Sequence, residues 1–275
     1  MKHGVNLAPF GAAADPRLLA ELAREAEDAG WDGFFLWDHI NWRDWGPEIG
    51  DPWVGLSAIA VATRRIRIGC LVTPLPRRRP TTLARQTVSL DHLCGGRLVL
   101  GVGLGSPDPE EFEDVGEEPQ MKRRGQMTDE ALELLGLLWS GEPVDFRGQF
   151  YRVRSEGFLP RPLQRPRIPV WVAAVCPFSA RPLRRAAAWD GVVPMLAEPR
   201  AIRSDEVRQA AAARPAGRPF EVLAGAHSGD DPQADRQRLS AYREAGATWW
   251  LEPLDPWRLP LKGLRHRIRQ GPISS

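Results

Sequence analysis

The sequence has 275 residues, 43% of them hydrophobic, and a formal net charge of +2 from 37 basic and 35 acidic residues. Such balanced charge argues against nucleic acid or an anionic membrane as a partner, and no apolar run reaches the ~18 residues of a membrane-spanning helix. Cys70, Cys94 and Cys176 fit neither a metal site nor a disulfide framework. With no signal peptide at the start, we expect a reduced, cytoplasmic setting.

Apolar runs that predict strands alternate along the chain with segments that predict helices. A first helix begins at Asp15-Pro16, where Asp caps and Pro fits the first turn, and ends at Gly30. The predicted strands cover residues 2–8, 33–37, 65–72, 98–102, 169–174, 191–195, 220–226 and 248–253. The later predicted helices cover 53–63, 81–93, 120–139, 182–188, 200–213, 232–245 and a tail from Pro256.

Eight strand-then-helix units predict an α/β fold, a (β/α)8 TIM barrel with parallel strands. Three similar helix-to-strand junctions support it: EAEDAGWDGFFLW, RRAAAWDGVVP and YREAGATWWLEP. The alternative is an open doubly wound sheet, which would place a glycine-rich turn where Ala8-Pro9-Phe10-Gly11 stands. We expect a single domain over 1–275. Residues 105–165 form an insertion or lid after the fourth strand, with a hairpin at 144–153.

His39, just after the second strand, is the best acid/base candidate, because active sites of this fold lie at the C-terminal strand ends. Asp38 could orient it; the alternative is an ordinary loop histidine. His3 lies at the wrong end of the barrel, His92 on a helix, and His227 is a weak second candidate. No Ser-His-Asp spacing and no metal-ligand constellation is evident.

Three loops could face a ligand. Gly101–Gly105 matches a dinucleotide loop poorly, but its small residues leave room for a flat molecule. The loop from Ala173, with Ser179 and Arg181 near a helix start, suits a phosphate or is an ordinary turn. Arg77–Arg79 could bind an anion, although such runs are usually solvated. Four tryptophans suggest an apolar or aromatic surface: Trp37, Trp42, Trp45 and Trp53.

Four segments carry a resemblance: DAGWDGFFLWDHI; IRIGCLVTPLPRRRPTTLARQTVSLDHLCGGRLVLGVGLGS; LLWSGEPVDFRGQFYRV; and IPVWVAA with RRAAAWDGVVP. In order and spacing the chain resembles the luciferase-like monooxygenase family, in particular its deazaflavin-dependent branch. The resemblance implies a bulge at the end of the third strand, often with a non-proline cis peptide, that backs the cofactor ring. It maps to Cys70–Thr73, with Leu71–Val72 as the expected cis bond.

The resemblance also implies a role for His39 near the reactive ring face, and for the loop after the fifth strand in holding the cofactor phosphate. We expect cofactor contacts from Asn6, Asp38, Cys70, Leu71, Val72, Thr73, Gly103, Ser106, Ala173, Ala174, Val175, Phe178, Ser179 and Arg181. Two positions depart from the family. Ser106 replaces the catalytic Glu of the sugar-phosphate dehydrogenases, and Ala173-Ala174 replaces a Gly-Gly pair, which narrows the space for a phosphate.

The implied function is a flavin- or deazaflavin-dependent oxidoreductase or monooxygenase acting on a small organic substrate. Reduced coenzyme F-420 is the preferred cofactor and FMN the alternative. A homodimer through the helices after strands two and three is implied as well. Two other functions stay open: a non-redox barrel enzyme on a phosphorylated substrate, with Glu252 as its carboxylate, and a vestigial family member.

Overall fold

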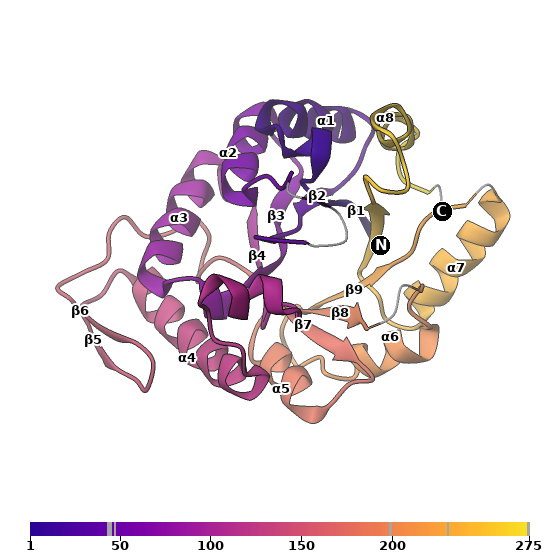
Figure 1. The fold of residues 1–275 in the computed structure, drawn as a ribbon. Coiled ribbons are helices and arrows are strands. Elements are labelled where there is room, and N and C mark those ends of the chain that lie inside the picture. Colours follow the sequence, from indigo (N-terminus) through magenta and orange to yellow (C-terminus); the bar gives the residue numbers. More distant parts are fainter. Residues whose placement is uncertain (43–45, 47, 198–199, 230, 274–275) are drawn as a thin grey trace.

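Eight parallel strands close a barrel in the order β1-β10-β9-β8-β7-β4-β3-β2, with the helices around it (Figure 1). The computed structural model describes residues 1–42, 46, 48–197, 200–229 and 231–273. The predicted (β/α)8 barrel is confirmed. Its strands are β1 (Lys2–Leu7), β2 (Gly33–Leu36), β3 (Arg67–Pro74), β4 (Leu98–Gly103), β7 (Val170–Cys176), β8 (Gly191–Leu196), β9 (Glu221–Gly225) and β10 (Trp249–Leu254).

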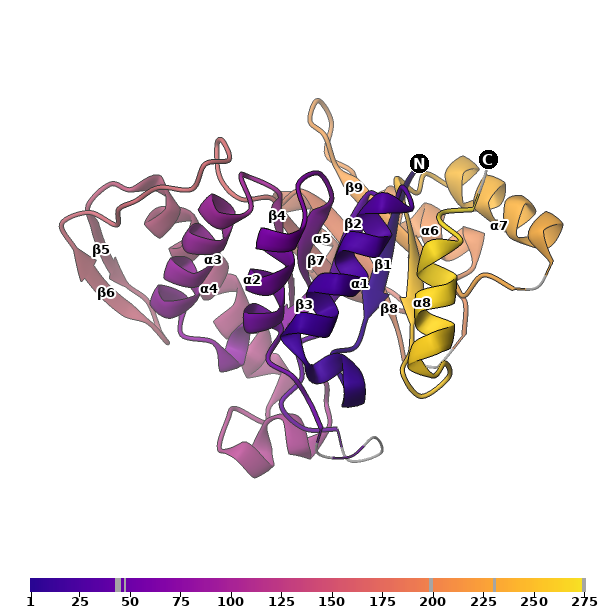
Figure 2. The ribbon, with the colours of Figure 1, turned by 90° about the horizontal axis from the view of Figure 1, so that it is seen from above.

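Each barrel strand is followed by one α-helix, as the predicted alternation requires. The helices are α1 (Pro16–Asp28), α2 (Pro52–Ala62), α3 (Pro80–Leu93), α4 (Met121–Ser140), α5 (Ala180–Ala188), α6 (Ser204–Ala211), α7 (Pro232–Glu244) and α8 (Leu261–Arg269). The predicted hairpin after β4 is confirmed as β5 (Val144–Arg147) paired with β6 (Arg152–Ser155), and it projects away from the barrel (Figure 2). Among the described residues, no helix is long and apolar enough to cross a membrane.

Several predicted boundaries were wrong, and for three of them the structure gives the cause. β3 continues two residues past Val72 because Thr73 and Pro74 pair with β4. α6 begins at Ser204, not at residue 200, because the Glu206 side chain accepts the backbone N–H of Arg203 (2.8 Å) and fixes the first turn there. α8 begins at Leu261 rather than near Pro256, since a residue before a proline, here Leu259, is disfavoured in a helix.

Two hydrophobic cores meet at the barrel wall. The outer core lies between strands and helices, and the inner core fills the barrel with Phe35, Trp171 and Trp249, whose ring centroids are 5.4–5.7 Å apart. Gly33 makes room for this aromatic packing: a Cβ there would come within 2.6 Å of the Phe35 ring. The barrel is therefore closed in its middle, and ligand chemistry belongs at its ends.

Candidate active site

The loops after β2, β3 and β4, three neighbouring strands, meet at the C-terminal end of the barrel (Figure 2). The loop after β2 carries Asp38 and His39, and the loop after β3 carries Arg77 and Arg78. Glu111 ends the short 3-10 helix η3 (Pro109–Glu111) after β4. Residues far apart in sequence thus form one polar cluster at this end, which we call the barrel mouth.

His39 is held by the buried Glu111 carboxylate. The His39 Nδ1 atom lies 3.0 Å from Glu111 Oε1, and the same oxygen accepts the backbone N–H groups of Ile40 and Asn41 at 3.2 Å. A carboxylate only accepts hydrogen bonds, so Nδ1 carries the proton, and in the neutral ring Nε2 carries the lone pair. Sequence reasoning found His39 but missed this partner, which stands 72 positions away.

Two of the three consecutive arginines belong to the site, so the expectation that they are solvated was wrong for them. The Arg77 side chain is 1% exposed, and its Nη2 donates to the Asp38 carbonyl (2.7 Å) and carboxylate (3.0 Å), while Nη1 donates to Glu111. Arg78 Nη2 donates to both Asp38 carboxylate oxygens at 2.7 Å. Arg79 is exposed. The two arginines thereby neutralise the two carboxylates.

The electrostatics keep the Glu111 side chain ionised. Burial raises the pKa of the Glu111 carboxyl, but the hydrogen bond and charge of His39, together with Arg77, lower it more strongly, and the net pKa lies below its ordinary value. Burial is the largest single influence on the pKa of the Arg78 guanidinium and lowers it. The charge and hydrogen bond of the Asp38 carboxylate act in the opposite direction, and the net pKa of Arg78 lies above its ordinary value. A fixed anion behind His39 stabilises a positive charge on the ring.

The loop that delivers Glu111 is anchored to α4. Arg124 donates to the carbonyls of Ser106 (2.6 Å) and Glu118 (2.7 Å), and its guanidinium lies 3.4 Å from the centroid of the buried Phe112 ring. Gly105 enters the loop at φ +84°, a conformation that favours glycine. The position of Glu111 is therefore set by α4 packing.

Aromatic rings surround the other side of His39. We call the set Phe10, Trp37, Trp42 and Trp257 the aromatic wall; it comes from the ends of β1, β2 and β10. Trp37 stacks on Trp42 with centroids 5.6 Å apart, and the Trp42 centroid lies 4.6 Å from that of His39. Trp257 packs 5.6 Å from Trp37. Trp37 and Trp42 of the four tryptophans predicted to form an aromatic surface lie in this wall, whereas Trp53 is buried in the outer core on α2. Trp45 lies outside the described residues.

The expected irregularity at the end of β3 is present. Cys70 pairs with Leu100 and Thr73 with Val102, so Leu71 and Val72 stand against the single residue Gly101. The Leu71–Val72 peptide bond is cis, as the resemblance implied. A Cβ placed on Gly103 would come 2.7 Å from Val72 Cγ2 and 3.4 Å from the Ala173 Cβ. The absence of a side chain at Gly103 therefore lets Val72 and Ala173 pack closely over β4.

Alternation along the strands divides the predicted contact residues into two groups. Leu71 lies in the inner core with Val72 packed against it, and Val175 follows the inner-facing Trp171 and Ala173 by even spacing. Cys70 and Ala174 lie in the outer core, so only one methyl of the Ala173-Ala174 pair faces the mouth. Phe178 also packs on the outer core, and Ser179 and Arg181 are exposed at the start of α5.

The remaining predicted polar residues have varied surroundings. The side-chain oxygen of Asn6 and the indole N–H of Trp37 are both buried, and neither has a hydrogen-bond partner among the described residues. The Ser106 hydroxyl binds Asp108, two residues on. Thr73 is fully buried at the end of β3. The Asp38 carboxylate is bound to Arg77 and Arg78, so it would influence a ligand only by positioning these two arginines.

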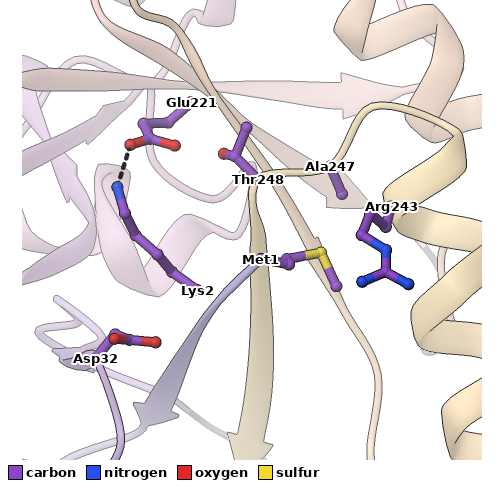
Figure 3. Close-up of a pocket in the computed structure, with 7 residues that line it drawn as sticks. All are labelled: Met1, Lys2, Asp32, Glu221, Arg243, Ala247 and Thr248. Atoms are coloured by element: carbon purple, nitrogen blue, oxygen red, sulfur yellow. Dashed lines mark hydrogen bonds and ion pairs between the residues drawn. The ribbon is translucent and has the colours of Figure 1, made fainter. Parts of the chain in front are cut away.

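Other candidates lie elsewhere. Glu252, the carboxylate of the non-redox alternative, is buried and accepts hydrogen bonds from Ser228 (2.9 Å) and Arg267 (3.1 Å). His227 pairs with Asp255 at 3.2 Å. A hollow of about 520 Å³ opens at the opposite, N-terminal end of the barrel, beside the ion pair of Lys2 and Glu221 (Figure 3). Within the described part of the chain, no group of His, Cys, Asp or Glu is placed to hold a metal ion.

A barrel with this β3 bulge and mouth chemistry has known relatives. The family model described as luciferase-like monooxygenase matches residues 2–265, and the chain belongs to that family. Over 175 residues it is 36% identical to the F420-dependent glucose-6-phosphate dehydrogenase of Gordonia bronchialis, and over 174 residues 35% identical to that of Nocardia farcinica. Each match covers 62% of this chain and 51% of the relative, so it spans about half the length of these relatives.

Solved structures of the same fold align over nearly the whole chain. The coenzyme F420-dependent tetrahydromethanopterin reductase of Methanopyrus kandleri has a TM-score of 0.76 at 18% identity, covering 98% of both chains. A monooxygenase of Streptomyces bottropensis has a TM-score of 0.74 at 22% identity, covering 98% of this chain and 97% of its own. At such identities the likeness establishes the fold alone.

Proposed function

We propose that the protein is an oxidoreductase that binds a deazaflavin, coenzyme F-420, at the barrel mouth and exchanges a hydride with a small organic substrate. The observation that carries the proposal is the pairing of two features at one end of the barrel. One is the bulge at the end of β3, where Val72 packs over Gly103 and would back a flat ring. The other is His39 with its Nδ1 proton fixed by Glu111. The deazaflavin-dependent names of the relatives support the choice of cofactor.

The residues at the ends of β3, β4 and β7 fit a bound deazaflavin. Val72, Gly103 and Ala173 would hold the flat ring, and the backbone of Cys70, Leu71 and Thr73 would support it from β3. Of the contacts predicted for the remainder of the cofactor, Asn6, Ser106, Val175, Ser179 and Arg181 would provide them from the C-terminal strand ends, whereas Ala174 and Phe178 pack on the outer core and Asp38 binds the two arginines. When bound, the reduced deazaflavin supplies a hydride.

This chain's own residues contribute positioning and proton transfer. His39 Nε2 can accept a proton from a substrate hydroxyl or, when the ring is charged, return one to a developing alkoxide. Glu111 keeps the ring oriented and stabilises its charged form, and Arg77 holds Glu111 in place. The aromatic wall shields the reacting atoms from water.

The non-redox function and the flavin cofactor, the two alternatives, have less support. A non-redox enzyme would need a second well-placed carboxylate or lysine at a strand end, and Glu252, the candidate for that role, is bound to Arg267 and Ser228. FMN remains the alternative cofactor because monooxygenases share the fold.

A parallel titration of the protein with oxidised coenzyme F-420 and with FMN tests the proposal. We expect the deazaflavin to bind with a Kd well below about 1 mM and more tightly than FMN. Single-turnover oxidation of the reduced deazaflavin should depend on His39. Tighter binding of FMN would show that the cofactor is a flavin and not a deazaflavin. If neither molecule bound, the proposal would be refuted.

We also propose a cytoplasmic homodimer that buries the outer face of α2. This helix is apolar on every side, and its outward-facing Val54 and Val61 are 57% and 70% exposed in the single chain. An exposed apolar helix face next to α3 fits an interface between two copies.

A further inference from the structure

A second histidine–carboxylate pair stands at the C-terminal end of the barrel, apart from the polar network around His39. His227 follows β9 and Asp255 follows β10, and these two strands are neighbours in the barrel. The His227 Nε2 atom lies 3.2 Å from Asp255 Oδ2, and the Asp255 side chain is only 8% exposed. A buried carboxylate is costly without a partner, and among the described residues His227 is its ion-pair partner.

Asp255 also closes the turn that carries Trp257. Its backbone carbonyl accepts the N–H groups of Arg258 (3.0 Å) and Leu259 (3.1 Å), and Trp257 lies within this turn, two residues after Asp255. The carbonyl of Asp255 therefore shapes the turn, while its carboxylate ties the turn to the loop after β9.

The packing beneath this turn is incomplete. A hollow of about 100 Å³ separates the segment between β10 and α8 from the short 3-10 helix η1 (Gly11–Ala14). Leu259 lines it on one side, and Phe10 and Ala13 line it on the other. Protein interiors are otherwise close-packed, and close packing holds a segment in place. A turn that borders unfilled space depends more on its polar contacts, here the pair of His227 and Asp255.

The turn reaches His39 through the aromatic wall. The Trp257 ring centroid lies 5.6 Å from that of Trp37 and 5.9 Å from that of Trp42. Those two rings in turn lie 5.8 Å and 4.6 Å from His39, centroid to centroid. A displacement of the turn would therefore change the rings that pack on the imidazole of His39.

We propose that His227 is a positioning residue of the active site. Through its pair with Asp255 it holds the turn between β10 and α8 in the position where Trp257 keeps the aromatic wall packed against His39. His227 acts through these residues and needs no contact with a substrate. Its part in catalysis rests on the proposed function, in which His39 transfers the proton, whereas the coupling between the two histidines can be measured without cofactor or substrate.

Nuclear magnetic resonance of the full chain, labelled with carbon-13 in its five histidines, tests the coupling. The Cε1–H resonance of His39 is assigned as the one that His39→Gln removes. We expect His227→Ala to shift this resonance, because the neighbouring indole rings move. His227→Gln, whose amide N–H can donate to the same carboxylate, should largely restore its position. Arg258→Ala changes an exposed side chain of the same turn and is the matched control, which should leave the resonance in place.

A double-mutant comparison tests the path. Trp257→Leu should itself shift the His39 resonance, and His227→Ala added to it should produce no further shift, because the coupling passes through Trp257. Thermal melting checks that each variant folds. If His227→Ala does not fold, His227→Leu restores most of the side-chain volume without the polar contact and takes its place.

Three outcomes would overturn the positioning role: an unmoved His39 resonance in the folded His227 variant, an equal shift in Arg258→Ala, or a full additional shift in the double variant. Deazaflavin affinity is measured separately on the same preparations. A protein that binds the deazaflavin and shows no coupling refutes the role of His227 alone. One that shows the coupling and binds no deazaflavin refutes the proposed cofactor and leaves His227 as the residue that positions His39.

Discussion

The imidazole of His39 and the buried carboxylate of Glu111 form a pair that joins the loops after β2 and β4, with Nδ1 and Oε1 3.0 Å apart. Arg77, from the strand between them in the barrel, binds the other Glu111 oxygen. The pair thus fixes both the tautomer of the candidate base and the position of the loop that covers it.

Glu111→Gln should leave cofactor affinity unchanged and lower kcat about 100-fold, because a neutral amide no longer fixes the Nδ1 proton or stabilises a charged ring. The kcat pH profile should lose or shift its limb near neutrality, which a merely structural defect would not cause. Glu113→Gln, an exposed neighbour, is the matched control. A profile identical to that of the unmodified enzyme would remove Glu111 from its positioning role.

Arg77→Met should destabilise the fold by about 3–5 kcal/mol, because the buried Glu111 carboxylate loses its guanidinium partner. Arg79→Met alters an exposed member of the same run and should change the free energy of unfolding by less than about 0.5 kcal/mol. Urea denaturation measures both. Equal effects from the two variants would contradict the buried network.

The loop between β8 and α6 should show an acid-sensitive contribution to stability. The hydrogen bond from Arg200 lowers the pKa of Glu206 to about 2 from its ordinary 4.5. A lowered folded-state pKa means that the stabilisation is complete above pH 4.5 and is lost as pH falls toward 2. Glu206→Gln should therefore be more destabilising at neutral pH than at low pH in urea unfolding. A difference that does not vary with pH would refute this ionic origin.

Val61→Asp on the outer face of α2 should convert the proposed homodimer into monomers, because a carboxylate would be buried against an apolar partner face. Light scattering after size exclusion gives the mass. Leu159→Asp, at an exposed leucine in the segment after the β5–β6 hairpin, should leave the mass unchanged. A monomeric unmodified protein would refute the dimer itself.

The order of strands and helices was predictable because apolar strand runs alternate with helical segments along the chain, and some helices also begin at a capping side chain, as at Asp15, which accepts the N–H of Arg17. His39 was predictable from its place after a strand. Glu111 was not, because its approach depends on a loop path set by Arg124 and Phe112.

The burial of Arg77 was likewise hidden, since a run of three arginines usually reads as a solvated surface. One signal pointed the other way: Asp38 and Glu111 follow the strands on either side of β3, and they need a counter-charge if both become buried. The alternation of side chains along β7 also shows that only Ala173 of the Ala173-Ala174 pair can narrow the space for a cofactor, because Ala174 faces the outer core.

The deazaflavin affinity of a Gly103→Ala variant, measured by equilibrium titration, tests the central claim most directly. The added methyl would lie 2.7 Å from Val72 Cγ2 and displace the side chain that would back the ring, whereas the control Gly136→Ala on α4 meets only an ordinary contact at 3.8 Å from Trp189. We predict at least about tenfold weaker binding of coenzyme F-420 to Gly103→Ala, with unchanged binding to Gly136→Ala. Equal affinity in both variants would show that the cofactor does not bind against Val72 and Gly103.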